Sequence, residues 1–541
     1  MFYAVEQFSE DEQEILRPYF TNLDRPVFAL VNLPEVVKGA LFARYSRSDK
    51  SLRRLFLDEF VGDLDVSGDL SIDASIGLKR AEQLYDRVFL EYGDDSVAQL
   101  GGVHLACEQS SNLLTKILEW GRLMSYLEQS TRYIPYDTTL SGRFRYYRPP
   151  DVLGSPIGAR YVIEMDGTFE RYRSMLPRLM EWARDTYPKE PSDSDFVYKQ
   201  TIKAKACDAV RGVLPAATLS NVGIYGTGQS YEALVLRMRA HPLPEARAYA
   251  EMVLDELRKV IPSFLSRVDR PERGGRWVDY LAGTRAHTEE TVGRLFADAE
   301  PAPAAEVELV DFDRDGEDKV LAAICYPHTN LPEWQVLERV RRLPTDERIA
   351  IVEAYVGERE NRRHRPGRAF ERTSYRFDIL GDYGAFRDLQ RHRMLTIEWQ
   401  SLTPRHGFDV PSAVVDAGLV DTFHDAMQRS AAFYDSMVET FPTEAAYAVA
   451  LAYRLRYVMQ MNAREAMHLI ELRSSQQGHP SYRRVAQAMH RLIAERAGHH
   501  AIAAAMRHVD HSEHELARLA AERAADARRN FQETSKKITT S

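Results

Sequence analysis

The amino-acid sequence predicts an α+β fold in two tandem units, and three observations lead to this prediction. Long segments have the apolar spacing of amphipathic helices, and shorter segments between them have strand character. Weak internal similarity also repeats on either side of a Pro/Ala-rich break at residues 296–320. Because the helices and strands do not alternate regularly, α+β domains are favoured over βαβ units.

Helical spacing is found in several segments, and these are residues 11–20, 96–130, 245–261, 447–476 and 514–533. Strands are expected where a short apolar run alternates with polar residues or ends in glycine, at residues 220–226, 307–312 and 373–380. The last dozen residues are expected to fray.

The composition break divides the chain into two expected domains. The first covers residues 1–295, the linker covers 296–305, and the second covers 306–541 with a helical C-terminal tail. Residues 135–200 are richer in Pro, Tyr and Asp and have no counterpart in the second half, so we expect an insertion there. The length supports two domains, because single cores stop growing at roughly 250 to 300 residues.

Composition and motif content exclude several classes of function. A net charge of −9 over 541 residues gives no basic field for a nucleic acid polymer. No apolar run is long enough for a membrane span and the N-terminus lacks a secretory pattern, so we expect a cytoplasmic protein. Three widely spaced cysteines without CxxC spacing argue against disulfides and a thiolate metal site. GxGxxG, Walker, HExxH and GxSxG motifs are missing, so any activity must depend on other residues.

The first candidate stretch is "RHRMLTIEWQS". A helix expected from about Ala385 into Ile397 would place Arg387 and Arg391 on one face, with the following His-Arg pair pointing elsewhere. The cations would then spread towards more than one anionic group. For this tripeptide alone, a solvated basic helix end is the simpler interpretation.

The second candidate stretch is "NAREAMHLIELRSSQ". Asn462 is expected to cap a helix on which Arg464 and His468 share a face. Arg473 lies beside the apolar stripe of that helix and needs an anionic partner, because an unpaired buried charge is costly. A surface ion pair with Glu471 is the alternative, and spacing alone favours it.

The third candidate stretch is "EQSTRY", which gathers Glu128, Gln129, Ser130 and Arg132. A carboxylate, an amide, a hydroxyl and a guanidinium could together read the edge and the phosphate of a nucleotide. A polar helix end entering a turn is the plainer interpretation of the same residues.

Together these stretches resemble the flavin-dependent thymidylate synthase (ThyX) family. Its signature of Arg-His-Arg, seven residues and a serine is matched without a gap by Arg391, His392, Arg393 and Ser401. Further similar segments are "EQSTRY" and "AVRGVLPAAT" in the first half and "NAR" and "LR" in the second. The chain therefore resembles two tandem ThyX-like domains, each expected to be a small, mostly antiparallel sheet packed with long helices.

Each half departs from the family pattern at a different place. The first half has Trp120, Gly121 and Arg122 at the Arg-His-Arg position, has "GDDS" in place of a "GHxS" stretch, and lacks "NAR". The second half has Trp399 where the family usually carries glutamate, and it lacks an "RxVLP" segment. The losses are complementary.

The resemblance implies how the two halves would share one site. Family active sites lie between subunits of a homotetramer, so we expect a composite site between the halves and a homodimer that forms a pseudo-tetramer. FAD would be bound by the second half through Arg391, His392, Arg393, Asn462, Arg464 and His468. The nucleotide dUMP would be bound by Glu128, Gln129, Ser130, Arg132 and Arg211 of the first half and by Arg473 of the second.

The activity that the resemblance implies is C5 methylation of dUMP to dTMP. Methylenetetrahydrofolate would supply the carbon and NADPH the reducing equivalents, with no protein nucleophile and no metal. Two alternatives stay open. One is a flavoenzyme that modifies another pyrimidine or uses another carbon donor, and the other is a non-catalytic flavin- or nucleotide-binding homologue.

Overall fold

The computed structural model describes residues 2–33, 48–59, 102–191 and 193–512, together with Lys38, Leu41, Phe42 and Tyr45. Two compact units are present. The first is built from Met1–Pro177, Val213–Pro301 and Leu419–Ala450, and the second from Arg178–Gly212, Ala302–Gly418 and Leu451–Ser541. The passage between Pro301 and Ala302 falls inside the expected linker, while the domain limits and the insertion at 135–200 stay predictions.

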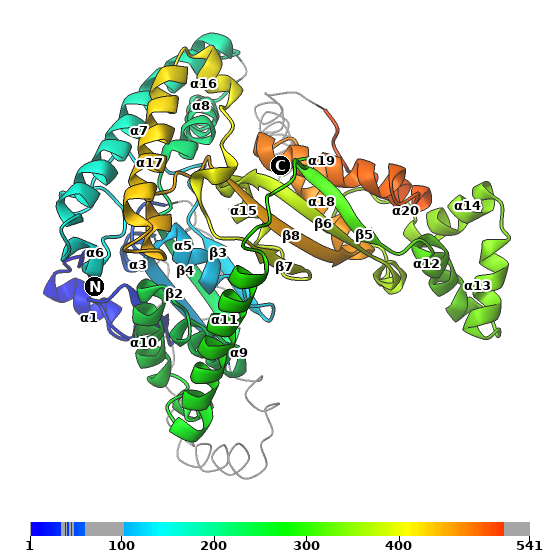
Figure 1. Cartoon of the computed structure of the whole chain (residues 1–541), viewed down its shortest axis with the longest axis horizontal. Helices are drawn as coiled ribbons and strands as arrows, with labels where there is room; N and C mark the ends of the chain where they lie inside the picture. Colours follow the sequence, from blue (N-terminus) through cyan, green and yellow to red (C-terminus); the bar gives the residue numbers. More distant parts are fainter. Residues whose placement is uncertain are drawn as a thin grey trace, which may run out of the picture. The chain divides into compact units, whose positions relative to one another are not determined.

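Each unit contains a four-stranded antiparallel sheet with the same strand order (Figure 1). In the first unit the strands lie in the order β1 (Val27–Leu30), β2 (Gly102–Ser111), β4 (Leu219–Thr227) and β3 (Met124–Glu128). In the second unit the order is β5 (Val307–Phe312), β6 (Ser374–Asp382), β8 (Arg454–Asn462) and β7 (Thr396–Trp399). The α+β prediction is confirmed, and the three expected strands are present as β4, β5 and β6.

Helices surround both sheets. Those of the first unit are α1 (Glu10–Leu16), α3 (Leu52–Glu59), α5 (Asn112–Leu118), α6 (Pro150–Leu153), most of α7 (Gly158–Thr186), α9 (Gly228–Arg239), α10 (Pro244–Arg258), α11 (Arg276–Leu295) and α17 (Val420–Met437). Those of the second are α8 (Asp195–Val210), α12 (Gly316–Cys325), α13 (Glu333–Arg341), α14 (Thr345–Val356), α15 (Tyr383–Leu389), α16 (Ser412–Asp416), α18 (Ala463–Arg473), α19 (Pro480–Glu495) and α20 (His500–Ala505). None of the helices in the described ranges is long and apolar enough to span a bilayer.

The two central strands of each sheet lead directly into capped helices. Ser111 and Asp382 cap α5 and α15, and Thr227 and Asn462 cap α9 and α18. In each case the cap side chain accepts a hydrogen bond from a backbone N–H of the first turn, which satisfies a donor that the helix itself leaves unpaired. This repeated strand–cap–helix plan places the residues that follow α5 and α15 at equivalent positions.

Two long segments with helical spacing contain strands, so their helical predictions were wrong in part. Within residues 96–130 the described part forms β2, α5 and β3, and residues 447–476 include β8 before α18. The sequence of β8, "RLRYVMQMN", alternates strictly between half-buried and buried residues. This period of two is a strand signal that the helical prediction overlooked.

The other helical predictions have clear outcomes. Residues 11–20 and 245–261 contain α1 and α10, as expected. The stretch "GDDS", the start of the 96–130 segment and the C-terminal tail from 513 onwards lie outside the described residues.

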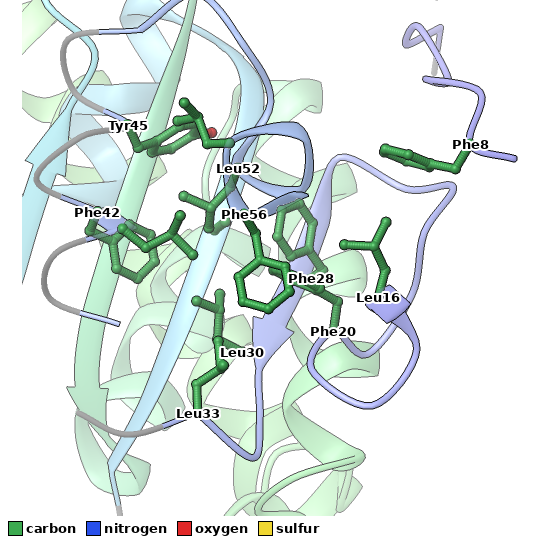
Figure 2. Close-up of a cluster of buried hydrophobic side chains, with 13 residues drawn as sticks. Phe8, Leu16, Phe20, Phe28, Leu30, Leu33, Phe42, Tyr45, Leu52 and Phe56 are labelled. Carbon is green, nitrogen blue, oxygen red and sulfur yellow. The ribbon is translucent and has the colours of Figure 1, made fainter. Parts of the chain in front are cut away.

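An aromatic cluster joins the first elements of the chain (Figure 2). The ring of Phe20 meets those of Phe28 on β1 and Phe56 on α3 edge-on, at centroid distances of 5.7 and 5.5 Å. The guanidinium of Arg53 lies 3.9 Å from the centre of the Phe28 ring. Such edge-to-face contacts favour one arrangement of α1, β1 and α3 over a looser apolar packing.

Each unit includes a segment that is distant in sequence from its sheet. Helix α17, which follows β7 in the chain, belongs to the first unit and lies along α7 (Figure 1). The pair is tied by Arg171 to Asp425 at 2.6 Å and by Arg429 to Glu164 at 3.0 Å. Helix α8 belongs to the second unit, although it precedes β4 in the chain.

A buried carboxylate also ties the α17 segment to the first unit. Glu245 on α10 is fully buried and accepts hydrogen bonds from Ser111 N at 2.9 Å, Ser111 Oγ at 2.5 Å and Tyr447 Oη at 2.6 Å. Burial raises the pKa of Glu245 to about 7, although the three hydrogen bonds lower it.

Replacing Tyr447 by phenylalanine should therefore destabilise the first unit. Loss of a hydrogen bond to a buried carboxyl group is expected to lower the free energy of unfolding by about 1 to 3 kcal/mol at pH 8. Urea unfolding followed by circular dichroism measures this change. Tyr280→Phe on the exposed face of α11 is the control, and equal losses in the two variants would contradict the role of Glu245.

Candidate functional site

The Arg-His-Arg stretch lies in a turn of the second unit, between α15 and β7. Helix α15 ends at Leu389, so the helix expected to continue into Ile397 was wrong. Ile397 instead lies on β7, where it is buried and pairs with Met459. His392 is buried, Arg391 is half-buried and Arg393 is exposed, so the three side chains have different surroundings.

Asn462 and Arg464 lie at the start of α18. The Asn462 side chain accepts a hydrogen bond from Glu465 N at 2.9 Å, which confirms the expected cap. Arg464 donates from Nε to the Pro366 carbonyl at 3.0 Å and lies 3.5 Å from Glu371. The cap therefore fixes the start of α18, on which Arg464 lies. The hydrogen bond to Pro366, in the loop before β6, fixes the direction of the Arg464 side chain.

His392 and His468 meet on either side of Glu465. The distance from His392 Nδ1 to Glu465 Oε1 is 3.1 Å, and that from His468 Nδ1 to Glu465 Oε2 is 3.4 Å. Each ring also has an arginine at its other nitrogen. Arg473 Nε donates to His392 Nε2 at 3.0 Å, and Arg365 Nη2 lies 3.1 Å from His468 Nε2.

The protonation states follow from these contacts and from burial. Burial and the nearby positive charge of Arg473 lower the pKa of His392 to about 4. The hydrogen bond to Glu465 acts in the opposite direction but is outweighed. Burial opposes ionisation of Glu465, but the hydrogen bonds from the two histidines outweigh it and lower its pKa to about 2. At neutral pH the carboxylate is charged and the His392 ring is neutral.

Arg211 and Arg473 share one carboxylate. Arg211, which follows α8 and lies in the second unit, has Nη1 3.5 Å from Asp388 Oδ2, and Arg473 Nη1 lies 3.8 Å from Asp388 Oδ1. The Arg211 side chain is buried, and its Nη2 has no hydrogen-bond partner among the described residues. A side chain on Gly384 would come within 3.4 Å of the same guanidinium. Arg211 is thus held close against the first turn of α15.

The alternative partner proposed for Arg473 was wrong. Glu471 is fully buried in an ion pair with Arg359, with Nη2 to Oε2 at 2.6 Å and Nη1 to Oε1 at 2.7 Å. Arg359 also donates to the Ala505 carbonyl at 3.2 Å. This bidentate pair ties the loop before β6 to α18 and the end of α20.

In the first unit, Glu128 and Gln129 make structural contacts. Glu128 is buried at the end of β3, and Lys116 Nζ reaches it at 3.2 Å and Glu119 at 2.6 Å. Gln129 is buried and donates from Nε2 to the Ser48 carbonyl at 2.8 Å. The nucleotide-binding roles expected of both residues remain predictions.

Ser130 and Arg132 follow in the turn. Ser130 is half-buried, its Oγ accepts a hydrogen bond from Arg132 N at 3.2 Å, and the Arg132 side chain is buried. The structure thus places the four residues of this stretch in the first unit and Arg211 with the Arg-His-Arg turn in the second.

The first unit has different chemistry at the position of the Arg-His-Arg turn. Trp120 and Gly121 follow α5 where Arg391 and His392 follow α15. The guanidinium of Arg237 lies 5.2 Å from the centre of the Trp120 ring, and burial lowers its pKa. A cation–aromatic contact therefore replaces the histidine–carboxylate array.

Three residues of the site were missed from the sequence, namely Glu465, Asp388 and Arg365. Two of them stand close to a recognised residue, because Glu465 follows Arg464 and Asp388 precedes the Arg-His-Arg turn. Arg365 lies in the basic run "RENRRHRPGR". A search for the carboxylates that buried arginines require could have found the first two.

The comparison with known families agrees with this duplicated architecture. The family model described as thymidylate synthase complementing protein matches twice, over residues 50–263 and 308–498. The chain therefore belongs to this family of thymidylate synthase-like proteins, as a tandem duplication in which each half has lost part of the motif set.

Relatives that align over nearly their whole length with this chain are known. A UPF0159 protein of Chlamydia muridarum (strain MoPn / Nigg) is 40% identical over 518 residues, which cover 95% of this chain and 97% of the relative. A UPF0159 protein of Chlamydia pneumoniae is 37% identical over 91% of this chain and 93% of its own length. A third, from Thermoplasma acidophilum, is 31% identical over 90% of this chain and 97% of its own length.

The buried His392 should make folding sensitive to acid. In the unfolded chain a histidine takes up a proton near pH 6.5, whereas the folded ring resists it until about pH 4, so stability falls as the pH drops through this window. Between pH 7 and pH 5 we expect this residue alone to cost about 2 kcal/mol.

The measurement compares urea unfolding at the two pH values in the wild type and in His392→Asn. The loss on acidification should be smaller in the variant by about this amount, and His328→Asn, at an exposed histidine, should behave like the wild type. An unchanged pH dependence in His392→Asn would contradict the assignment.

Proposed function

We propose that the chain is a flavin-dependent enzyme that methylates dUMP at C5 to give dTMP. Methylenetetrahydrofolate would be the carbon donor and NADPH the reductant, in the cytoplasm. The observation that carries the proposal is the junction at Asp388 and His392. There Arg211 and Arg473, expected to bind the nucleotide, meet the Arg-His-Arg turn expected to bind the flavin.

The nucleotide phosphate would be bound by Arg211 and Arg473. A phosphate monoester carries nearly two negative charges, and arginine forks hold such groups with charge-assisted bonds of about 1.5 to 3 kcal/mol each. Both guanidiniums are already oriented towards one carboxylate, Asp388, and the buried Nη2 of Arg211 offers a donor that no described residue uses. A phosphate oxygen could accept a hydrogen bond from this donor, which supports the binding of an anion beside Arg211.

FAD would be bound by the residues around the Arg-His-Arg turn and the start of α18. Arg391, Arg393 and Arg464 carry the guanidinium groups suited to a pyrophosphate, and Arg393 is exposed. Asn462 acts through its cap of α18, and His392 and His468 act through the Glu465 array. When bound, FAD supplies the redox chemistry of methyl transfer, while these residues orient it and balance its charge.

The EQSTRY stretch would complete the site by supplying a second set of groups that bind the nucleotide. Ser130 and Arg132 carry a hydroxyl and a guanidinium suited to a phosphate or a base edge. Glu128 is neutralised by Lys116, so its contribution would be to hold the end of β3 that precedes these two residues. The composite site and the homodimeric pseudo-tetramer stay predictions, and the mass of the chain in solution tests the latter.

An absorption spectrum of the purified chain, with and without dUMP, tests the proposal. We expect a flavin spectrum that bleaches with NADPH and formation of dTMP when methylenetetrahydrofolate and dUMP are added. Bleaching without dTMP would favour another pyrimidine or another carbon donor. No flavin after incubation with FAD would favour a non-catalytic homologue and would refute the proposal.

Two substitutions should distinguish residues that bind the flavin from residues that bind the nucleotide. Arg391→Ala should abolish FAD retention, whereas Arg211→Ala should weaken dUMP binding by about tenfold or more with FAD retained, because each removes one charge-assisted contact. FAD is followed by its absorbance after gel filtration, and dUMP by calorimetry. Arg122→Ala, in the corresponding turn of the first unit after α5, is the control. Equal effects of Arg391→Ala and Arg122→Ala would count against specialisation of the second unit.

A further inference from the structure

The cluster around Glu465 forms a continuous line of five polar groups in the second unit. In order they are Arg473, His392, Glu465, His468 and Arg365, and neighbouring groups are joined at 3.0, 3.1, 3.4 and 3.1 Å. The centres of the two rings lie 5.4 Å apart, and the ring planes are inclined at 63° to each other. Glu465 is buried at the centre of this line.

The contacts on both sides of each ring, with an arginine and with Glu465, show which ring nitrogen carries the hydrogen. A guanidinium can only donate hydrogen bonds, so Nε2 of His392 and Nε2 of His468 must both act as acceptors. In a neutral ring the other nitrogen then carries the hydrogen, and both Nδ1–H groups donate to Glu465. Each oxygen of the carboxylate therefore selects the tautomer of one ring.

A metal ion is the competing interpretation of these three side chains. His392, Glu465 and His468 offer ligand atoms that all lie within 4.8 Å of one another. Coordination through Nδ1 would move the ring hydrogens to Nε2, where they would face the N–H groups of Arg473 and Arg365. Two donors facing each other repel, and both arginines add positive charge, so the array opposes a cation.

We propose that Glu465 is the positioning residue of this site, which fixes the tautomers of His392 and His468 so that their Nε2 atoms hold Arg473 and Arg365 in place. Arg473 is one of the two arginines proposed to bind the nucleotide phosphate, and in this respect the inference rests on the proposed function. The pKa values agree, because a Glu465 carboxyl at about 2 and a His392 ring at about 4 are a charged acceptor and a neutral donor at pH 7.

The first unit supports this role by what it lacks. Ser230 occupies the third position of α9, where Glu465 occupies the third position of α18. Ser230 donates to the Leu123 carbonyl, and Gly121 stands at the position of His392. The unit that has glycine at the histidine position thus has a hydroxyl group, and not a carboxylate, at the position of Glu465.

The tautomers can be read directly by NMR on the full chain labelled with ¹⁵N in its histidines. Two-bond ¹H–¹⁵N spectra at pH 7 distinguish Nδ1–H from Nε2–H rings, and His392→Asn and His468→Asn identify the two signals. We expect both rings to be neutral with the hydrogen on Nδ1. A wild-type His392 ring that carries its hydrogen on Nε2 would overturn the proposal.

Glu465→Gln should disturb the array without removing its volume. An amide has one acceptor oxygen, and its NH₂ group would face the second ring, so at least one histidine should change its tautomer. Glu495→Gln, an exposed residue at the end of α19, is the matched control and should leave both signals unchanged. Unchanged His392 and His468 signals in Glu465→Gln would refute the positioning role.

Measurements of dUMP binding test whether Glu465 affects function. We expect dUMP to bind about tenfold more weakly to Glu465→Gln, as is common when a residue that orients a ligand-binding side chain is removed, with partial recovery in Glu465→Asp. If the wild type shows the expected tautomers but binds no dUMP, the proposed function fails and the positioning role stands. If Glu465→Gln binds dUMP as the wild type does, the positioning of Arg473 by this array is refuted.

Zinc ions provide the last test. Titration of the wild type with ZnCl₂ should leave the His392 and His468 signals in place. A stoichiometric shift of both signals would show that the array is a metal site and would overturn the proposal. If Glu465→Gln fails to fold, the wild-type tautomers and this titration still decide the question.

Discussion

The second unit is organised by the need to pair charges that its fold has buried. Glu465, Glu471, Arg211 and Arg359 all lie in the interior, where an uncompensated charge costs several kcal/mol. Arg211, Arg359 and Glu471 are met by an opposite charge from another element, and Glu465 by hydrogen bonds from two histidine rings. The ends of α8, α15, α18 and α20 are thus held in one arrangement by their polar groups. The sheet supplies the frame, but these pairs determine where the guanidinium groups point.

The two units show how a duplicated scaffold can be kept while its chemistry diverges. Strand order, helix caps and the lengths of α5 and α15 agree. The polar residues of the two units differ. In the first unit Lys116 forms ion pairs with Glu119 and Glu128, whereas in the second unit the polar cluster is centred on Glu465 of α18. Main-chain hydrogen bonds and apolar packing specify the scaffold, and they tolerate exchange of the side chains that follow the helices. Function can therefore be lost from one copy without loss of its fold.

Much of this could be inferred from the sequence, and the failures have physical causes. The duplication, strands β4, β5 and β6, the Asn462 cap and the Arg-His-Arg motif were accessible from patterns and motifs, whereas the turn that carries this motif was expected to be helical. Strands β2 and β8 were not recognised, because a helix follows each without a break and the helical spacing of that helix was extended back over the strand. The partners of the arginines depend on contacts between residues such as Arg211 and Asp388, which local spacing does not reveal. Motif matching also favours residues shared with a family, and Glu465 is not part of the motif.

The reciprocal placement of α8 and α17 has a consequence for the history of this chain. Each compact unit includes one helix from the far side of the linker expected at residues 296–305. Fission of the gene at that linker would yield two polypeptides, neither of which contains all the segments of either unit. A single cut at that position would therefore not release either unit intact, so the composition of the units ties both copies to the fused chain.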